Sequence, residues 1–174
     1  VTLSILARKP VKTPVVLQME AAECGAASLG KILAYNKKYV PLEELRQKCG
    51  VSRDGSKASN VLKAAREYGF KAKGYRKDPD ALRDVQLPAI IHWNFNHFLV
   101  LEGFSKKGVH LNDPACGRRR VSVEEFDQSF TGVVLLLQPS EDFVPSGKKS
   151  DFFSSLRMRL KGSETGVLMV FLLG

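Results

Sequence analysis

Cys24 and Gln18 are spaced as the nucleophile and the oxyanion donor of a thiol-dependent acyl-transfer reaction would be. Cys24 begins a run of small and apolar residues whose periodicity predicts a helix. A thiol at a helix N-terminus has a lowered pKa, because the helix dipole and the free N–H groups stabilise the thiolate. Gln18 lies six residues upstream, where its amide can donate a hydrogen bond to the oxyanion formed when a thiolate attacks a carbonyl carbon. Taken alone, a cysteine in this place is more often inert packing.

A histidine and an aspartate that could complete this chemistry lie about seventy residues further on. His92 and His97 flank the stretch Trp93-Asn94-Phe95-Asn96, and Asp113 ends a later apolar run, just before Pro114. A histidine can accept the thiol proton and then protonate the leaving amine, and a carboxylate can fix the tautomer and orientation of the ring. Five residues apart, the two histidines would face opposite sides of a continuous strand. The residue types alone leave the choice of base open.

The composition indicates one domain with its own core. The chain has 174 residues, of which 44% are hydrophobic. The net charge of +9 favours acidic partners, but no zinc-finger, RNP or helix-turn-helix motif accompanies it, so we expect no nucleic-acid binding. The three cysteines lack the spacing of a zinc site, and so few of them fit a reducing compartment. We expect Cys49 and Cys116 to be packed or loop thiols. Residues 1–13 lack the apolar stretch of a secretory signal.

The order of the elements predicts an α+β fold, with helices first and an antiparallel sheet after them. Two prolines make residues 1–13 an extended arm. Helical periodicity and helix-start residues such as Ser59 and Ser122 predict helices at 24–35, 42–49, 59–68 and 122–130, with a helical turn at 79–85. Apolar, β-branched and aromatic runs predict strands at 70–75, 89–95, 98–104, 108–112 and 133–138. The tight turn between the third and fourth of these makes them antiparallel.

The composition changes after Pro139. Residues 140–150 have the composition of a polar linker, and residues 151–174 combine a basic amphipathic stretch with the apolar run Val167–Leu173. That run is too short to cross a bilayer, which takes about twenty residues. One interpretation is a terminal core strand. We favour a basic interfacial helix followed by the start of a truncated transmembrane helix, because the apolar run is cut at Gly174.

Taken together, these residues resemble the C39 peptidases, the papain-like N-terminal domains of bacterial peptidase-containing ABC transporters. The family pattern is a glutamine, then Asp-Cys-Gly-x-Ala, then His-Phe-Val-Val-Leu, then Asp-Pro-Ala. This chain has Gln18, Glu23-Cys24-Gly25-Ala26-Ala27, His97-Phe98-Leu99-Val100-Leu101 and Asp113-Pro114-Ala115. The resemblance covers about Pro14 to Gln138 and places a peptidase domain over residues 14–139. Glu20 and Glu23 stand where the common form has aspartate, as in the subgroup that serves precursors with nitrile-hydratase-like or Nif11-like leaders.

The resemblance implies a role for each residue. Cys24 would be the nucleophile, His97 the general base and acid, Asp113 the group that orients His97, and Gln18 the oxyanion donor. Such a domain is a cysteine endopeptidase that removes the leader of ribosomally made precursors, of the bacteriocin or lanthipeptide type, after a Gly-Gly or Gly-Ala pair, while its transporter exports the product. No metal or cofactor is expected in this chain; ATP and Mg²⁺ would serve the full-length transporter.

The resemblance also implies partners and a location. The precursor would carry an amphipathic helical leader, which would lie in a groove of the domain. The other partners would be the transmembrane and nucleotide-binding domains of the same transporter, a homodimer at full length. The expected location is the cytoplasmic face of the bacterial membrane.

Three other interpretations were weighed against this one. Gly50–Lys57 approaches a phosphate-binding loop, but Ser56 and Lys57 are transposed and the segment follows a helix instead of a buried strand, so we interpret it as a loop. A C39-like module that binds peptides without cleaving them is disfavoured by Cys24. A stand-alone papain-like protease, or a transglutaminase-like acyl transferase with the same triad, is disfavoured by the basic and apolar segment 151–174.

Overall fold

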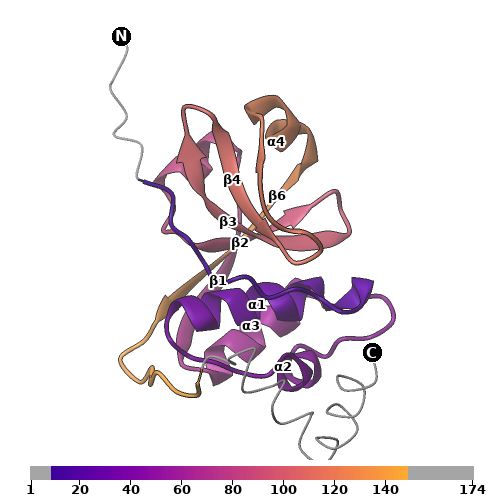
Figure 1. Cartoon of the computed structure of the whole chain (residues 1–174), viewed down its shortest axis with the longest axis vertical. Helices are drawn as coiled ribbons and strands as arrows, with labels where there is room; N and C mark the ends of the chain where they lie inside the picture. The colour runs from indigo at the N-terminus through magenta and orange to yellow at the C-terminus, as the bar shows by residue number, and fades with distance from the viewer. Residues whose placement is uncertain (1–8, 149–174) are drawn as a thin grey trace, which may run out of the picture.

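In residues 9–148, the part of the chain that the computed structural model describes, helices come first and strands follow (Figure 1). The helical elements are η1 (Ala21–Glu23), α1 (Cys24–Tyr35), α2 (Leu42–Lys48), α3 (Ala58–Glu67), η2 (Asp80–Asp84) and α4 (Val123–Ser129). The strands are β1 (Phe70–Arg76), β2 (Ala89–Trp93), β3 (His97–Ser105), β4 (Gly108–Asp113), β5 (Gly117–Val121) and β6 (Phe130–Pro139). They form one antiparallel sheet in the order β1-β6-β2-β3-β4-β5. The predicted α+β class is confirmed.

Helix α1 is buried along its length, from Cys24 to Ala34. Its small residues allow this, because they let the neighbouring helices come close. A Cβ atom added at Gly30 would lie 3.0 Å from Leu45 of α2, and one at Gly25 would lie 3.1 Å from Val61 of α3. A helix packed this tightly cannot slide or rotate without clashes. Its N-terminal residue, Cys24, is therefore held at a fixed place.

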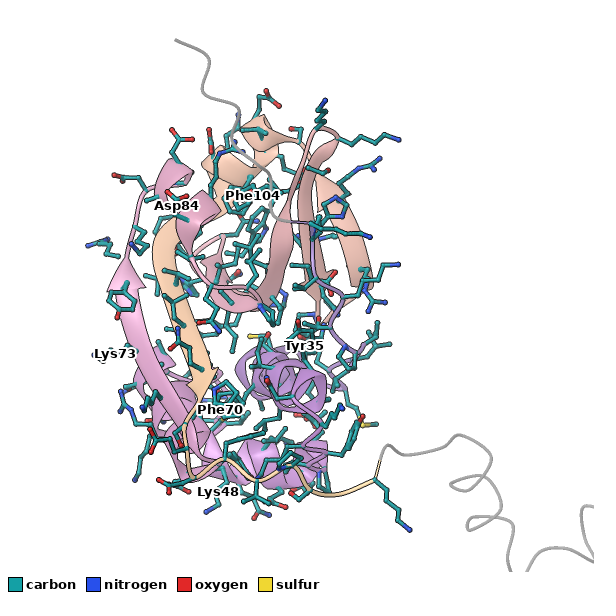
Figure 2. All side chains as sticks on the ribbon, turned by 90° about the vertical axis from the view of Figure 1, so that its left-hand side faces the viewer. Tyr35, Lys48, Phe70, Lys73, Asp84 and Phe104 are labelled. Carbon is teal, nitrogen blue, oxygen red and sulfur yellow. The ribbon has the colours of Figure 1, made fainter. Side chains whose placement is uncertain are left out.

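The sheet separates two apolar clusters, because successive side chains of a strand point to opposite faces. Ile90 of β2 and Val100 of β3 belong to the cluster beneath α1, α2 and α3. Their neighbours Ile91 and Leu99 belong to the second cluster, which α4 covers. Figure 2 shows the two regions, with Phe70 beside the helices and Phe104 at the other end of the molecule. With both faces covered, β2 and β3 have the continuous apolar sequences of fully buried strands.

Three details differ from the sequence prediction. Helix α3 begins at Ala58 with Lys57 in the N-cap position, so the predicted cap at Ser59 is wrong. Strand β6 begins at Phe130, directly after α4, three residues earlier than predicted. Strand β5 was not predicted, because its sequence Gly-Arg-Arg-Arg-Val has no apolar alternation. It forms at the edge of the sheet through its backbone pairing with β4.

The N-terminal arm, residues 9–18, lies against the sheet. The N–H of Val11 donates to the carbonyl of Glu102 in β3 over 2.9 Å. Figure 1 shows the arm running from the sheet toward the helices, where the chain enters η1 and α1. The first part of the predicted arm, residues 1–8, lies outside the described residues.

The start of the predicted linker contacts the domain. The Ser140 hydroxyl donates to the carbonyl of Gly69 over 2.7 Å, and the ring of Phe143 packs edge-on against Phe70 with centroids 4.8 Å apart. The predicted interfacial helix and membrane segment, residues 151–174, lie outside the described residues. The position of the domain boundary therefore stays a prediction. In residues 9–148, no helix has the length and apolar character needed to span a membrane.

Candidate active site

The Cys24 side chain is buried at the first turn of α1, and its surroundings favour the thiolate. Burial alone raises the pKa of a thiol. A hydrogen bond to His97, the charge of that ring, and the backbone N–H groups of Phe98 and Gly25 outweigh burial, so the pKa of Cys24 is lowered from its ordinary value. The predicted helix start at Cys24 is confirmed. The thiol is therefore in an environment that activates it as a nucleophile.

His97 begins β3 and lies between the thiol and a carboxylate. Its Nε2 is 2.7 Å from Oδ1 of Asp113, which leaves Nδ1 for the hydrogen bond to Cys24. Burial lowers the pKa of His97, but the bonds to Asp113 and Cys24 and the charges of both raise it to about 9. The ring is therefore held protonated at neutral pH, as the cationic partner of a thiolate.

Asp113 ends β4 and is nearly buried, with a relative exposure of 5%. Burial raises the pKa of this carboxyl group. The bond to His97, the N–H of Ala115 at 2.9 Å, and the charges of His97 and Arg119 outweigh burial and lower the pKa to about 2. Arg119 Nε contacts Oδ2 at 3.1 Å. Asp113 is therefore ionised, and both of its oxygens have partners.

Gln18 is on the arm, and the structure shows only part of its environment. Its backbone N–H donates to the carbonyl of Pro114 over 2.9 Å, which ties the arm to the residue after Asp113. Its side-chain Oε1 is buried and has no hydrogen-bond partner among the described residues. The structure thus brings Cys24, His97 and Asp113 into one row, while the oxyanion role of Gln18 stays a prediction.

His92, the other candidate base, has different partners. Asn94 and Phe95 adopt left-handed backbone conformations, so the chain turns between the two histidines and they lie on neighbouring strands, β2 and β3. His92 Nδ1 is 3.0 Å from the Thr131 hydroxyl, and the ring packs against Phe98. Burial, and then the charge of His97, lower its pKa. It contacts no carboxylate in the described residues, so it lacks the partner that orients a general base.

A cleft of about 300 Å³ opens beside Cys24. One wall is the loop Arg53–Ser56, and the other comes from His92 and the turn after β2, including the exposed Phe95; Ala21 and Ala22 line it as well. The loop comes this close because residue 25 is glycine. A Cβ atom there would lie 3.1 Å from Cβ of Ser56. The cleft leads to the Cys24 thiol.

Sequence reasoning missed Glu23, which organises the chain just before the nucleophile. This side chain is 1% exposed. Its Oε2 accepts the N–H groups of Met19 at 2.7 Å and Glu20 at 3.1 Å, and its Oε1 pairs with Arg46 Nε at 3.1 Å. Glu23 therefore fixes the turn between Gln18 and Cys24. A carboxylate just before a candidate cysteine was visible in the sequence, but its bonds depend on the fold.

The Peptidase C39 family matches residues 12–142. The colicin V secretion/processing ATP-binding protein of Escherichia coli is 36% identical over 132 residues, which cover 76% of this chain and 19% of that protein. The chain thus spans about a fifth of the length of this relative.

Two solved structures are also similar. A double glycine motif protease from an AMS/PCAT transporter, in complex with the leader peptide, is 60% identical with a TM-score of 0.75, over 76% of this chain and 96% of that one. The peptidase domain of Streptococcus ComA has a TM-score of 0.70 at 23% identity, over 74% and 100% of the two chains, and supports the fold alone. The chain belongs to the peptidase C39 family of cysteine peptidases.

Proposed function

We propose that this domain is an endopeptidase in which Cys24 is the nucleophile, His97 the general base and acid, Asp113 the orienting carboxylate and Gln18 an oxyanion donor. The observation that carries the proposal is the hydrogen-bonded row from the thiol through the imidazole to the carboxylate. The surroundings of each member favour the ionisation that the reaction needs: a lowered pKa for the thiol, an imidazolium and a carboxylate.

The reaction follows from this geometry. The Cys24 thiolate attacks the carbonyl carbon of the scissile peptide bond, and the negative charge moves to the carbonyl oxygen. The Gln18 amide and the N–H groups at the start of α1 can stabilise that oxyanion. His97 then gives its proton to the leaving amine, and the C–N bond breaks. The resulting thioester is hydrolysed by a water that His97 deprotonates, which frees the thiol for another cycle.

We propose that the substrate is a precursor peptide cut after Gly-Gly or Gly-Ala. The Arg53–Ser56 loop forms one wall of the cleft beside Cys24, and a cleft that accepts only small side chains next to the thiol would select such a pair. The similar protease whose structure is known is described as a double glycine motif protease bound to a leader peptide. A valine in place of the second glycine should therefore block cleavage through a steric clash, without weakening the binding of the leader.

The N-terminal arm offers a place for an amphipathic leader. Val15, Leu17 and Met19 alternate along the extended arm and are all exposed, Met19 to 88%. Together they form an apolar stripe on the segment that leads to Gln18. We propose that apolar side chains of the leader pack on this stripe while the small residues enter the cleft.

The proposed setting is the cytoplasmic face of a bacterial membrane, as part of an exporter. The colicin V relative is a secretion/processing ATP-binding protein, of which this chain matches a fifth. In the proposed full-length homodimer, the nucleotide-binding domains would use ATP and Mg²⁺ to export the peptide that this domain has released.

Replacement of the nucleophile tests the proposal. Cys24→Ala should abolish cleavage of a Gly-Gly precursor, read by mass spectrometry, and leave precursor affinity within a few fold, because the alanine keeps the packing of α1. Cys116→Ala is the matched control; this thiol is exposed, and its loss should leave turnover unchanged. Continued turnover by the Cys24→Ala protein would contradict the assignment of Cys24 as the nucleophile.

A further inference from the structure

Four polar side chains form a buried chain of hydrogen bonds away from the cleft. They are Thr13, Lys31, Glu102 and Asn112, and none is more than 3% exposed. None of them lines the cleft beside Cys24. Charged side chains are almost never buried this deeply without a specific arrangement around them.

The bonds run in one direction across the molecule. Lys31 Nζ donates to the carbonyl of Asn112 at 3.1 Å and to its Oδ1 at 2.6 Å. Asn112 Nδ2 donates to Oγ1 and to the carbonyl of Thr13, at 2.8 and 3.2 Å. The N–H and the hydroxyl of Thr13 both donate to Oε1 of Glu102, at 2.6 and 2.8 Å. Arg118 closes the far end, with Nε 3.4 Å from the same oxygen.

Each member belongs to an element that carries one proposed catalytic-site residue. Lys31 lies on α1 seven residues after Cys24, two helical turns along the same face. Asn112 immediately precedes Asp113 on β4. Glu102 is on β3, the strand that His97 begins. Thr13 is on the arm, five residues before Gln18. The network therefore joins all four elements at their common centre.

Stability alone does not account for this network. Burial lowers the pKa of Lys31 to about 8, against the charges of Asp113 and Glu102, so the ammonium group is poorly compensated. Apolar side chains of similar size usually fill such a space at no loss of stability. Fully bonded polar groups, in contrast, permit only one relative placement of the segments that carry them, because any other placement leaves a buried group unpaired.

We propose that Lys31 and Asn112 are positioning residues for catalysis, which hold the arm in the one register that presents Gln18 to the oxyanion. The proposal rests on the function proposed above. The arm makes a further bond beyond Thr13, from the Gln18 N–H to the carbonyl of Pro114. Loss of the Lys31 ammonium removes the group that holds the Asn112 side chain. Thr13 keeps its bonds to Glu102 and Arg118 but loses the fixed position of Asn112, so the arm that carries Gln18 is held less firmly.

A double-mutant cycle in the 174-residue chain tests this positioning role. Lys31→Met keeps the length of the side chain and removes the charge, so the fold should persist. With a peptide carrying Gly-Gly before an aminocoumarin leaving group, kcat should fall roughly tenfold or more with KM nearly unchanged, as expected when oxyanion stabilisation is weakened. The effect should vanish in a Gln18→Ala background, because there is no longer an amide to misplace.

Three further measurements complete the test. Lys38→Met is the matched control, since Lys38 donates to a backbone carbonyl outside the network, and kcat should not change. Thr13→Val breaks the network at the arm. It should lower kcat as Lys31→Met does, and it should have no such effect in the Gln18→Ala background. This second variant keeps the proposal testable if Lys31→Met fails to fold. The rate of Cys24 alkylation by iodoacetamide should match the wild type in both variants, because the thiolate–imidazolium pair stays intact.

Two results would overturn the proposal. One is an unchanged kcat in both network variants. The other is a fall in kcat that is as large in the Gln18→Ala background as in the wild type, which would mean that the network has a general structural role. Neither depends on whether Cys24 is the nucleophile, because that assignment fails only if Cys24→Ala remains active.

Discussion

Cys24 and Asp113 act on opposite nitrogens of His97, and the result is a ring that stays protonated to about pH 9. In the folded protein the pKa of His97 is raised, so the stabilisation that it provides is complete below its ordinary pKa and is lost as the pH rises through about 9. The stabilisation that the Asp113 carboxyl group provides depends on pH in the opposite direction. Its pKa is lowered to about 2, so its contribution is lost only in strong acid. The ion pair with the thiolate also requires a pH above the pKa of Cys24, which the bond to His97 and the charge of that ring lower against the effect of burial.

The pH dependence of cleavage can be predicted from this arrangement. The rate constant kcat/KM should fall on the alkaline side as His97 loses its proton near pH 9. Asp113→Asn removes the charge that raises the pKa of His97, so the alkaline limb should move to lower pH and kcat should fall. Asp127→Asn, an exposed carboxylate on α4, is the control and should leave the profile in place. If the alkaline limb of the kcat/KM profile lies at the same pH in the wild type and in Asp113→Asn, the proposed effect of Asp113 on the pKa of His97 is contradicted.

At the scale of single residues, the sequence predicted the proposed catalytic residues better than the buried residues that hold them in place. The cysteine, the histidine and the aspartate were proposed from their types, their order and a family resemblance, and the structure brings them together. The resemblance, not the spacing, selected His97 over His92, and the turn at Asn94 and Phe95 separates the two. Lys31 could not be predicted, because a lysine in a helix is normally exposed and its buried partner lies 81 residues away.

At the scale of elements, the contact between α1 and the Arg53–Ser56 loop shapes the cleft. Gly25→Ala would place a Cβ atom 3.1 Å from Ser56 and Val61, and forcing such a contact typically costs about 1–3 kcal/mol. The loop can move more easily than α3, so we expect kcat/KM for a Gly-Gly substrate to fall at least several fold. The measurements are steady-state kinetics and urea denaturation.

Gly74→Ala on β1 is the matched control for this substitution. Its added Cβ atom would lie 3.3 Å from Leu62, a contact of similar tightness that lies away from the cleft. It should reduce the free energy of unfolding slightly and leave turnover intact. An equal effect of the two alanines on turnover would mean that the Gly25 contact affects only stability.

The elements themselves were predictable where packing and periodicity agree. The helices were found because small and apolar residues recur at helical spacing, and Ser122 does cap α4, accepting the N–H of Glu125 at 3.1 Å. Ser59 has the same residue type but lies inside the first turn of α3, where no cap bond forms. Strand β5 was missed, because pairing with β4 and the ion pairs of its arginines decide its conformation, and neither is visible in a local pattern.

At the scale of the whole molecule, the C-terminal limit of the domain can be tested by truncation. A chain ending at Lys148 should fold and cleave like the 174-residue chain, because it keeps every contact of the described C-terminal segment. A chain ending at Pro139 loses the partly buried Phe143 ring from its place against Phe70, and so loses part of the roughly 1.5–3 kcal/mol that full burial of such a ring contributes. Urea denaturation and precursor cleavage measure both. Loss of folding in the Lys148 chain would show that residues 149–174 belong to the core.

The place of β6 has a consequence for how the chain acquires its structure. This strand is the last of the six in sequence, yet it lies inside the sheet, between β1 and β2. Until it is synthesised, β1 has no neighbour and the cluster beneath the helices lacks Leu135 and Leu137. Because such long-range pairings must form late and slowly, a nascent chain stays incomplete until about Pro139 has left the ribosome. We therefore expect the row of Cys24, His97 and Asp113, which joins α1 to β3 and β4, to be complete only after the whole domain has emerged.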